Sequence, residues 1–236
     1  MNILLIGYGK MGKAIEAIAI QGGHRIAGIH DPSAGKSFDF TTPVDVAIEF
    51  TQPEAAPANI RLCLDHGIPV LSGTTGWLEH KADVEAYCRQ KSGTFFYASN
   101  YSLGVNLFFR LNEQLARMMS KVSGYDPSID EVHHTQKKDA PSGTAITLAE
   151  GILRHLPFKK QWVNHETREA ADLVIRSYRV DPTPGTHTVT YRSPVDDLEI
   201  RHTAHSREGF AQGAVAVAEW LPNRRGVLGM DDFLQF

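Results

Sequence analysis

The chain has 236 residues, of which 42% are hydrophobic and 22% charged, a composition typical of a folded protein with one large or two small domains. Its formal net charge is −3, so charge gives no reason to expect a nucleic acid as the main partner. Cys63 and Cys88 lack a Cys-x-x-Cys spacing, which disfavours a zinc site or a redox pair and fits a reducing, cytoplasmic compartment. The first apolar run is too short for a signal peptide or a membrane span, and we expect no membrane partner.

The first hundred residues alternate between short apolar runs and helical patterns. Strands are predicted at 3–6, 24–29, 45–50, 69–72 and 94–98, and helices at 11–19, 54–66 and 78–91. Strands that alternate with helices of 10 to 15 residues indicate βαβ units with a parallel sheet and right-handed crossovers.

The pattern changes after about residue 103. Helices are predicted at 105–120, 143–155 and 210–220, and strands at 128–134, 173–179, 186–191 and 197–205. Strands without intervening helices indicate a mixed or antiparallel sheet in a second domain. We therefore predict an α/β protein. An N-terminal Rossmann domain comprises residues 1–103 and 209–236, and an α+β domain with a mixed sheet comprises 104–208.

A glycine motif follows the first strand: Gly7-Tyr8-Gly9-Lys10-Met11-Gly12. Gly7 permits a tight turn, Gly9 lets the backbone approach a pyrophosphate, and Gly12 allows close helix packing. The helix that follows offers unpaired N–H groups to phosphates, and Asp31, about 20 residues on, suits the adenosine ribose hydroxyls. A glycine-rich turn that binds nothing is the alternative. With strand, helix and acid all in place, we expect a nicotinamide dinucleotide to bind at Gly7, Gly9, Lys10, Met11, Gly12 and Asp31.

The residues after Asp31 bear on the choice of cofactor. Pro32-Ser33 follows it, with no arginine alongside to bind a 2′-phosphate, which favours NADH over NADPH. Lys10 and Lys36 are near enough in sequence to reach such a phosphate, so use of both cofactors stays open.

Two further segments follow predicted strands, where open α/β sheets place their ligands. Gly73-Thr74-Thr75-Gly76 follows the fourth strand and Ala98-Ser99-Asn100-Tyr101 the fifth. Their hydroxyls and amides suit the nicotinamide end of the cofactor. A simple turn is the alternative for the first segment, and a hinge between domains is compatible with contact for the second.

The most polar stretch, residues 131–145, lies between a predicted strand and a predicted helix, as functional loops often do. Ser142-Gly143-Thr144 begins the helix, so its first amides can bind a carboxylate. His133, His134 and Lys137 add a titratable acid and positive charge. Together they predict a pocket for a small acidic substrate with a proton donor.

Each of these residues has a simpler interpretation. Ser142 can act as an N-cap as well as, or instead of, contacting a ligand, and spacing alone does not separate Lys137 from Lys138. No third His, Cys or carboxylate stands at ligand spacing from the histidine pair, so we expect no metal site.

The segment His133-His134-x-x-Lys137-x-Asp139-Ala140-Pro141-Ser142-Gly143-Thr144-Ala145 resembles the signature of the 4-hydroxy-tetrahydrodipicolinate reductase (dihydrodipicolinate reductase) family, of the diaminopimelate route to lysine. Other parts of the chain match in the same order. They are the glycine motif, Phe50-Thr51-x-Pro53, Gly73-Thr74-Thr75-Gly76, Asn100-Tyr101-Ser102-x-Gly104-Val105-Asn106, and Ser206-Arg207 with Phe210-Ala211-x-Gly213-Ala214-Val215.

The resemblance implies an NAD(P)H-dependent reductase. Its substrate is the small dicarboxylate 4-hydroxy-tetrahydrodipicolinate, reduced via dihydrodipicolinate to tetrahydrodipicolinate with loss of water. His133 would donate the proton and Lys137 would be its cationic partner. The second domain would bind the substrate, build a homotetramer and close over the cofactor. The residues implied for substrate are His134, Lys137, Ser142, Gly143 and Thr144, and those added for cofactor are Phe50, Gly73, Thr74, Thr75, Ala98, Ser99, Asn100, Tyr101 and Arg207.

The chain departs from the family pattern in a short adenosine-side stretch before Asp45, and in Trp77 and Tyr101 where phenylalanine is common. Two other functions stay open. Another NAD(P)-dependent dehydrogenase of an acidic substrate would need a catalytic cysteine or base in the second domain, whereas both cysteines lie in the first. A dinucleotide-sensing regulator would need a basic helix-turn-helix or a partner surface, and none is recognisable.

Overall fold

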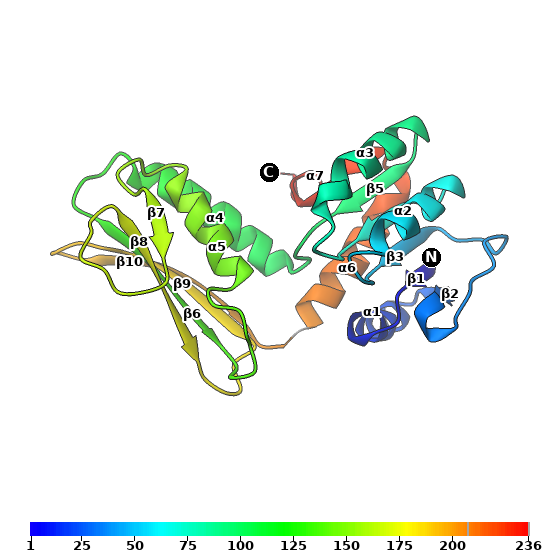
Figure 1. Cartoon of the computed structure of the whole chain (residues 1–236), viewed down its shortest axis with the longest axis horizontal. Coiled ribbons are helices and arrows are strands. Elements are labelled where there is room, and N and C mark those ends of the chain that lie inside the picture. Colours follow the sequence, from blue (N-terminus) through cyan, green and yellow to red (C-terminus); the bar gives the residue numbers. More distant parts are fainter. Residues whose placement is uncertain (207, 236) are drawn as a thin grey trace. The chain divides into compact units, whose positions relative to one another are not determined.

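The computed structural model describes residues 1–206 and 208–235, so the predicted cofactor residue Arg207 lies outside the described residues. The chain forms two compact units, Met1–Ser102 with Glu208–Phe236, and Leu103–Arg207, drawn in Figure 1. No helix among the described residues is long and apolar enough to cross a membrane.

The first unit contains a six-stranded parallel sheet in the order β11-β5-β4-β3-β1-β2. β2 and β3 pair with opposite edges of β1, so the direction of winding reverses there. Open α/β sheets bind ligands at the carboxyl ends of the strands beside such a reversal. The strands are β1 (Asn2–Ile6), β2 (Arg25–His30), β3 (Val46–Glu49), β4 (Val70–Ser72), β5 (Thr94–Tyr97) and β11 (Gly226–Leu228).

Helices cover both faces of this sheet, because its central strands are apolar on both sides. In β1, Ile3 and Leu5 join one buried cluster with α1 (Lys10–Gln21) and α6 (Glu208–Trp220), whereas Leu4 and Ile6 join another with α2 (Ala56–Asp65) and α3 (Lys81–Gln90). The remaining helical segments are α7 (Met230–Leu234) and the 3₁₀ turns η1 (Pro32–Ala34), η2 (Leu78–His80) and η3 (Leu221–Asn223). The predicted Rossmann-type layering is confirmed.

The second unit has a five-stranded mixed sheet in the order β10-β9-β6-β8-β7. β9 runs antiparallel to both of its neighbours, β10 and β6, whereas β6, β8 and β7 run parallel to one another. Two helices, α4 (Leu103–Met119) and α5 (Gly143–Leu153), pack on one face of the sheet and form its core. The strands are β6 (Asp126–His133), β7 (Gln161–Val163), β8 (Asp172–Arg179), β9 (Gly185–Arg192) and β10 (Asp197–Ala204).

The other face of this sheet carries no helix within the described part of the unit. A shallow hollow on it is lined by side chains of β6, β8, β9 and β10, with Val132, Tyr178 and Thr188 among them. The lining alternates along the strands with residues of the helix-covered face, as a pleated sheet requires.

Three elements were not expected from the sequence: β7, β11 and α7. β7 and β11 have three residues each and α7 has five, too few for a periodic pattern to show. The helix expected from residue 54 begins at Ala56, because a turn precedes it, and the one expected from residue 78 starts as the 3₁₀ turn η2 before α3.

Candidate active site

The glycine motif lies at the carboxyl end of β1, beside the end of β3. Gly7 has a φ of +87°, and a Cβ there would lie 2.1 Å from the carbonyl oxygen of Phe50. A Cβ on Gly12 would lie 2.4 Å from the carbonyl oxygen of Gly7, whereas nothing lies within 4 Å at Gly9. Two glycines thus close the turn, and the third leaves open backbone at the start of α1, where a pyrophosphate fits.

Asp31 fastens the glycine motif from the end of β2. Its Oδ2 accepts a hydrogen bond from Tyr8 N at 2.9 Å, and its Oδ1 accepts from Ser33 Oγ at 2.6 Å and Ala34 N at 3.2 Å. The hydrogen bond from Ser33, followed by that from Tyr8, holds the pKa of this carboxyl below its usual value. Lys36 Nζ lies 4.0 Å from the ring centre of Tyr8, so a cation stands beside the acid.

A buried carboxylate that the sequence did not reveal supports the first of the two loops predicted for the nicotinamide end, the one after β4. Glu49, at the end of β3, is fully buried and accepts hydrogen bonds from Ser72 Oγ at 2.5 Å, Thr74 Oγ1 at 2.9 Å and Thr51. Burial raises the pKa of Glu49, and these bonds offset the effect only in part. Thr74 is therefore buried with its hydroxyl bound to Glu49.

The other predicted cofactor residues of these loops differ in exposure. Phe50 is half-buried, and its ring occupies the space that a Cβ on Gly73 would fill, at 2.1 Å. Tyr101 is buried, with its hydroxyl donating to the Ser72 carbonyl at 2.9 Å. The remaining ones are Ala98, which is buried, Asn100 and Met11, which are half-buried, and Thr75, Ser99 and Lys10, which are exposed.

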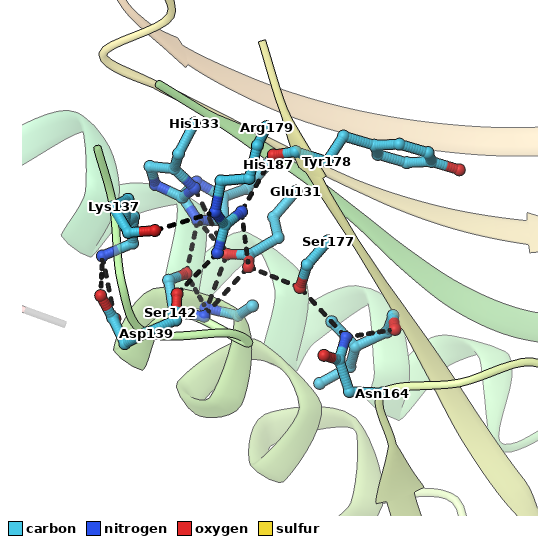
Figure 2. A network of polar contacts seen from close by, with 12 residues as sticks. Glu131, His133, Lys137, Asp139, Ser142, Asn164, Ser177, Tyr178, Arg179 and His187 are labelled. Carbon is cyan, nitrogen blue, oxygen red and sulfur yellow. Dashed lines mark hydrogen bonds and ion pairs between the residues drawn. The ribbon is translucent and has the colours of Figure 1, made fainter. Parts of the chain in front are cut away.

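A second polar site forms in the mixed sheet at the end of β6, shown in Figure 2. Strand register brings its members together: Glu131 lies opposite Ser177 of β8 and His187 of β9, and His133 lies opposite Arg179 of β8. Because these residues occupy alternate positions, their side chains share the helix-covered face of the sheet.

Glu131 is the centre of this network. Its carboxylate is fully buried and accepts hydrogen bonds from Ser142 N at 3.1 Å to each oxygen, and from Ser177 Oγ at 2.7 Å. His187 Nε2 lies 3.6 Å and Arg179 3.7 Å from it. Burial alone would raise the pKa of Glu131, but the polar contacts with His187, Ser142 and Ser177 outweigh burial and lower it to about 2.

His133 is buried beside this carboxylate. Its Nδ1 lies 3.5 Å from Glu131 Oε2, and its ring packs edge-on against His187 with centroids 5.0 Å apart. Burial, followed by electrostatic interactions with His187, Lys137 and Arg179, lowers the pKa of His133 to about 4, while Glu131 opposes the shift. On the other side of the ring, a Cβ on Gly185 would lie 3.1 Å from Nε2, so the glycine leaves room for His133.

Lys137 lies on the loop that follows, with its charge paired. Its Nζ is 2.9 Å from both carboxylate oxygens of Asp139. Arg179 holds the backbone of this loop by donating from Nε to the Lys137 carbonyl at 3.3 Å and from Nη2 to the Asp139 carbonyl at 2.6 Å. His134 is half-buried at the start of the same loop.

The N-terminus of α5 completes this group. Ser142 is buried, and its Oγ accepts from Ala145 N at 3.2 Å and lies 3.1 Å from His187 Nε2. The hydroxyl therefore caps the helix. Gly143 is exposed, with nothing within 4 Å of a Cβ position, and Thr144 is half-exposed. The unpaired N–H groups at the start of α5 can bind an anion.

Two family models cover almost the whole chain. The model described as dihydrodipicolinate reductase, N-terminus, matches residues 1–101, and the one described as dihydrodipicolinate reductase, C-terminus, matches residues 104–234. The chain belongs to the dihydrodipicolinate reductase family. The family, the reductase role and the dinucleotide-binding fold predicted from the sequence are thereby confirmed.

Individual relatives agree with this assignment. A 4-hydroxy-tetrahydrodipicolinate reductase of Christiangramia forsetii is 48% identical over 99% of this chain and 98% of its own. One of Nitratidesulfovibrio vulgaris is 37% identical over 78% of this chain and 73% of its own. A dihydrodipicolinate reductase from Paenisporosarcina sp. TG-14, solved with dipicolinate bound, has the same fold, with a TM-score of 0.81 at 21% identity over 98% of this chain and 99% of that one.

The spacing argument against a metal site does not hold in three dimensions. Sequence spacing showed no third metal ligand near the histidine pair, yet Glu131, His133 and His187 each place a potential ligand atom within 4.8 Å of the others. Strand pairing brings His187 in, which spacing cannot show. The cations of Lys137 and Arg179 stand beside this cluster, and they disfavour a divalent ion there. That the site holds no metal stays a prediction.

Sequence reasoning also missed Glu131, Arg179 and His187 as parts of the site. One signal was available: Glu131 precedes His133 by two residues in a predicted strand, so both belong on the same face. His187 and Arg179 needed the register of β8 and β9. The predicted substrate residues lie together in the second unit, and the predicted cofactor residues that the structure describes lie in the first.

Proposed function

We propose that this reductase converts 4-hydroxy-tetrahydrodipicolinate, via dihydrodipicolinate, to tetrahydrodipicolinate. The hydroxyl leaves as water, and a hydride and a proton add to the unsaturated ring. The observation that carries the proposal is the grouping, in the second unit, of His133, the charge of Lys137 and the open start of α5. The relative that matches 99% of this chain is named for this activity, which supports the same reaction.

The substrate is a dianion, and the site supplies groups of two kinds to bind it. Lys137 gives up its ion pair with the exposed Asp139 and binds one substrate carboxylate instead. The amides and the hydroxyl of Gly143 and Thr144 bind the other, where the dipole of α5 favours negative charge. His134, on the same loop, contributes to carboxylate binding, and Ser142 acts as the cap that fixes the start of the helix.

His133 donates the proton. Its Nε2 faces the space that Gly185 leaves open, whereas its Nδ1 is turned to Glu131. A bound dianion raises the proton affinity of a neighbouring imidazole, so substrate binding prepares His133 for its role. A reduced nicotinamide dinucleotide, when bound in the first unit, supplies the hydride.

We propose that the cofactor residues are those of the glycine motif, Asp31 and the two loops that follow β4 and β5, and that NADH is favoured over NADPH. The Asp31 carboxylate is ionised and held in place, so it repels a 2′-phosphate and accepts from a ribose hydroxyl. Lys36 lies beside Tyr8 in the same loop pair, which leaves NADPH as a second cofactor.

We further propose a cytoplasmic homotetramer without nucleic-acid or membrane partners. The uncovered sheet face of the second unit supports the assembly, because Tyr178 and Val180 are 46% and 52% exposed. A sheet face of this kind is normally covered in a folded assembly.

Oxidation of reduced nicotinamide, with NADH and NADPH in parallel, tests the function. The substrate is generated in place from pyruvate and aspartate semialdehyde by the preceding synthase. Oxidation that requires the synthase, and is faster with NADH, is expected. Nucleotide binding without oxidation would refute the proposed substrate, and faster oxidation of NADPH would refute the cofactor preference.

A further inference from the structure

The second unit faces a conflict between two requirements. A pocket that binds a dianion has to be cationic, yet cations around a buried imidazole expel its proton. Here Lys137 from the loop, Arg179 from β8 and His187 from β9 all face His133. Asp139 does not offset them, because it is exposed and both its oxygens contact Lys137.

Glu131 is the one carboxylate, among the described residues that face His133, in a position to resolve this conflict. Its Oε2 is 3.5 Å from His133 Nδ1, and this nitrogen is buried without a hydrogen-bond partner among the described residues. No solvent screens the pair, since the carboxylate is fully buried and His133 is only 7% exposed. A charge interaction at this distance is strong in such surroundings.

The carboxylate is also held rigidly. Ser142 N donates to both oxygens and Ser177 Oγ donates to Oε1, so the α5 N-terminus and β8 fix it from two sides (Figure 2). These donors come from the backbone and a neutral hydroxyl. They stabilise the ionised carboxylate without neutralising its charge, and the charge stays directed at the imidazole.

We propose that Glu131 is a positioning residue whose fixed negative charge favours protonation of His133 within a cationic, substrate-binding pocket. Glu131 contacts His133 and the start of α5 rather than the substrate. By bonding to Ser142 N it also sets the distance between the proton donor and the amides of Gly143 and Thr144. The inference rests on the proposed role of His133 as proton donor.

A direct test is the titration of His133 by NMR, which needs no turnover. Ring signals are followed against pH in the wild type, Glu131→Gln and Ser177→Ala, each with and without saturating dipicolinate, and His133→Gln assigns the signal. Glu131→Gln keeps the shape and most hydrogen bonds but removes the charge. In this variant we expect the protonation constant of His133 to fall about tenfold or more, which moves its titration midpoint down by about one pH unit. Ser177→Ala, which removes one bond and keeps the charge, should change the constant less than about threefold.

Kinetics provide the second measurement. In Glu131→Gln the alkaline limb of the kcat profile, where a proton donor loses its proton, should move to lower pH by the same amount, while the Kd for NADH stays at the wild-type value. Glu166→Gln is the matched control, because Glu166 is an exposed carboxylate of the same unit that pairs with Arg176 at 2.6 Å. Its titration curve and pH profile should match the wild type.

Three results would overturn the proposal. The first is an unchanged His133 titration in folded Glu131→Gln. The second is an equal shift in Ser177→Ala, which would show that packing and not charge matters. If Glu131→Gln does not fold, Glu131→Asp replaces it, because the shorter side chain moves the carboxylate away from His133 Nδ1. The third result is an unchanged His133 titration in Glu131→Asp. Absence of turnover in the wild type would refute the proposed reaction alone, because the titration would still report on the pair.

Discussion

Replacing His133 by glutamine should make the protein less sensitive to acid. In the folded chain burial lowers the pKa of His133 to about 4, whereas an exposed histidine titrates near 6.5. The unfolded chain therefore takes up a proton first as the pH falls. Stability contributed by the neutral ring is complete above pH 6.5 and is lost between about pH 6.5 and 4. At pH 5.0 the two values correspond to a loss of about 2 kcal/mol, from a maximum of about 3 kcal/mol.

The assay is urea unfolding at pH 7.5 and pH 5.0, followed by circular dichroism. The wild type should lose about 2 kcal/mol more than His133→Gln between the two pH values. His165→Gln, which changes an exposed histidine of the same unit, is the control and should behave as the wild type. Equal losses of unfolding free energy in the wild type and His133→Gln would refute the argument that the His133 ring is neutral in the folded protein.

Other consequences concern turnover, nucleotide binding and assembly. His133→Ala and Lys137→Ala should each lower kcat about 100-fold or more in the coupled assay while NADH affinity by fluorescence titration is retained; near-normal turnover would remove that residue from the mechanism. Gly7→Ala should abolish NADH binding, because the new Cβ would lie 2.1 Å from the Phe50 carbonyl oxygen at a φ of +87°; wild-type affinity would contradict the tight turn. Tyr178→Asp, on the uncovered sheet face, should reduce the proposed tetramer to smaller species in light scattering, and an unchanged mass would exclude that face.

The architecture of the first unit was accessible from the sequence because each layer leaves a local pattern. Buried strands are apolar runs, and the glycine motif marks the turn after β1. The same holds for the loop from His133 to Thr144, where polar residues crowd between a strand and a helix. Strand register leaves no such pattern, so the partners that β8 and β9 bring to His133 could not be predicted.

The chemical character of each loop was also easier to predict than the hydrogen bonds that its residues make inside the protein. Asp31 was expected to face the ribose, yet its carboxylate also accepts one hydrogen bond from the glycine motif and two from the 3₁₀ turn that follows it. Glu49 carries no motif at all, because a carboxylate in a strand shows its role only once Ser72 and Thr74 surround it. Buried polar groups depend on tertiary contacts, and these are what a single sequence conceals.

Because β6 is pleated, its odd-numbered and even-numbered residues lie on opposite faces of the sheet. Glu131 and His133 point to the helix-covered face with the chemistry, whereas Asp130 and Val132 line the uncovered face. With the proposed assembly through the uncovered face, substitutions at the even-numbered positions alter assembly without altering chemistry, and those at the odd-numbered positions do the reverse. Insertion or deletion of a single residue in this strand would exchange the two sets at once. We expect the length of β6 to be far less free to vary than the identity of its even-numbered residues.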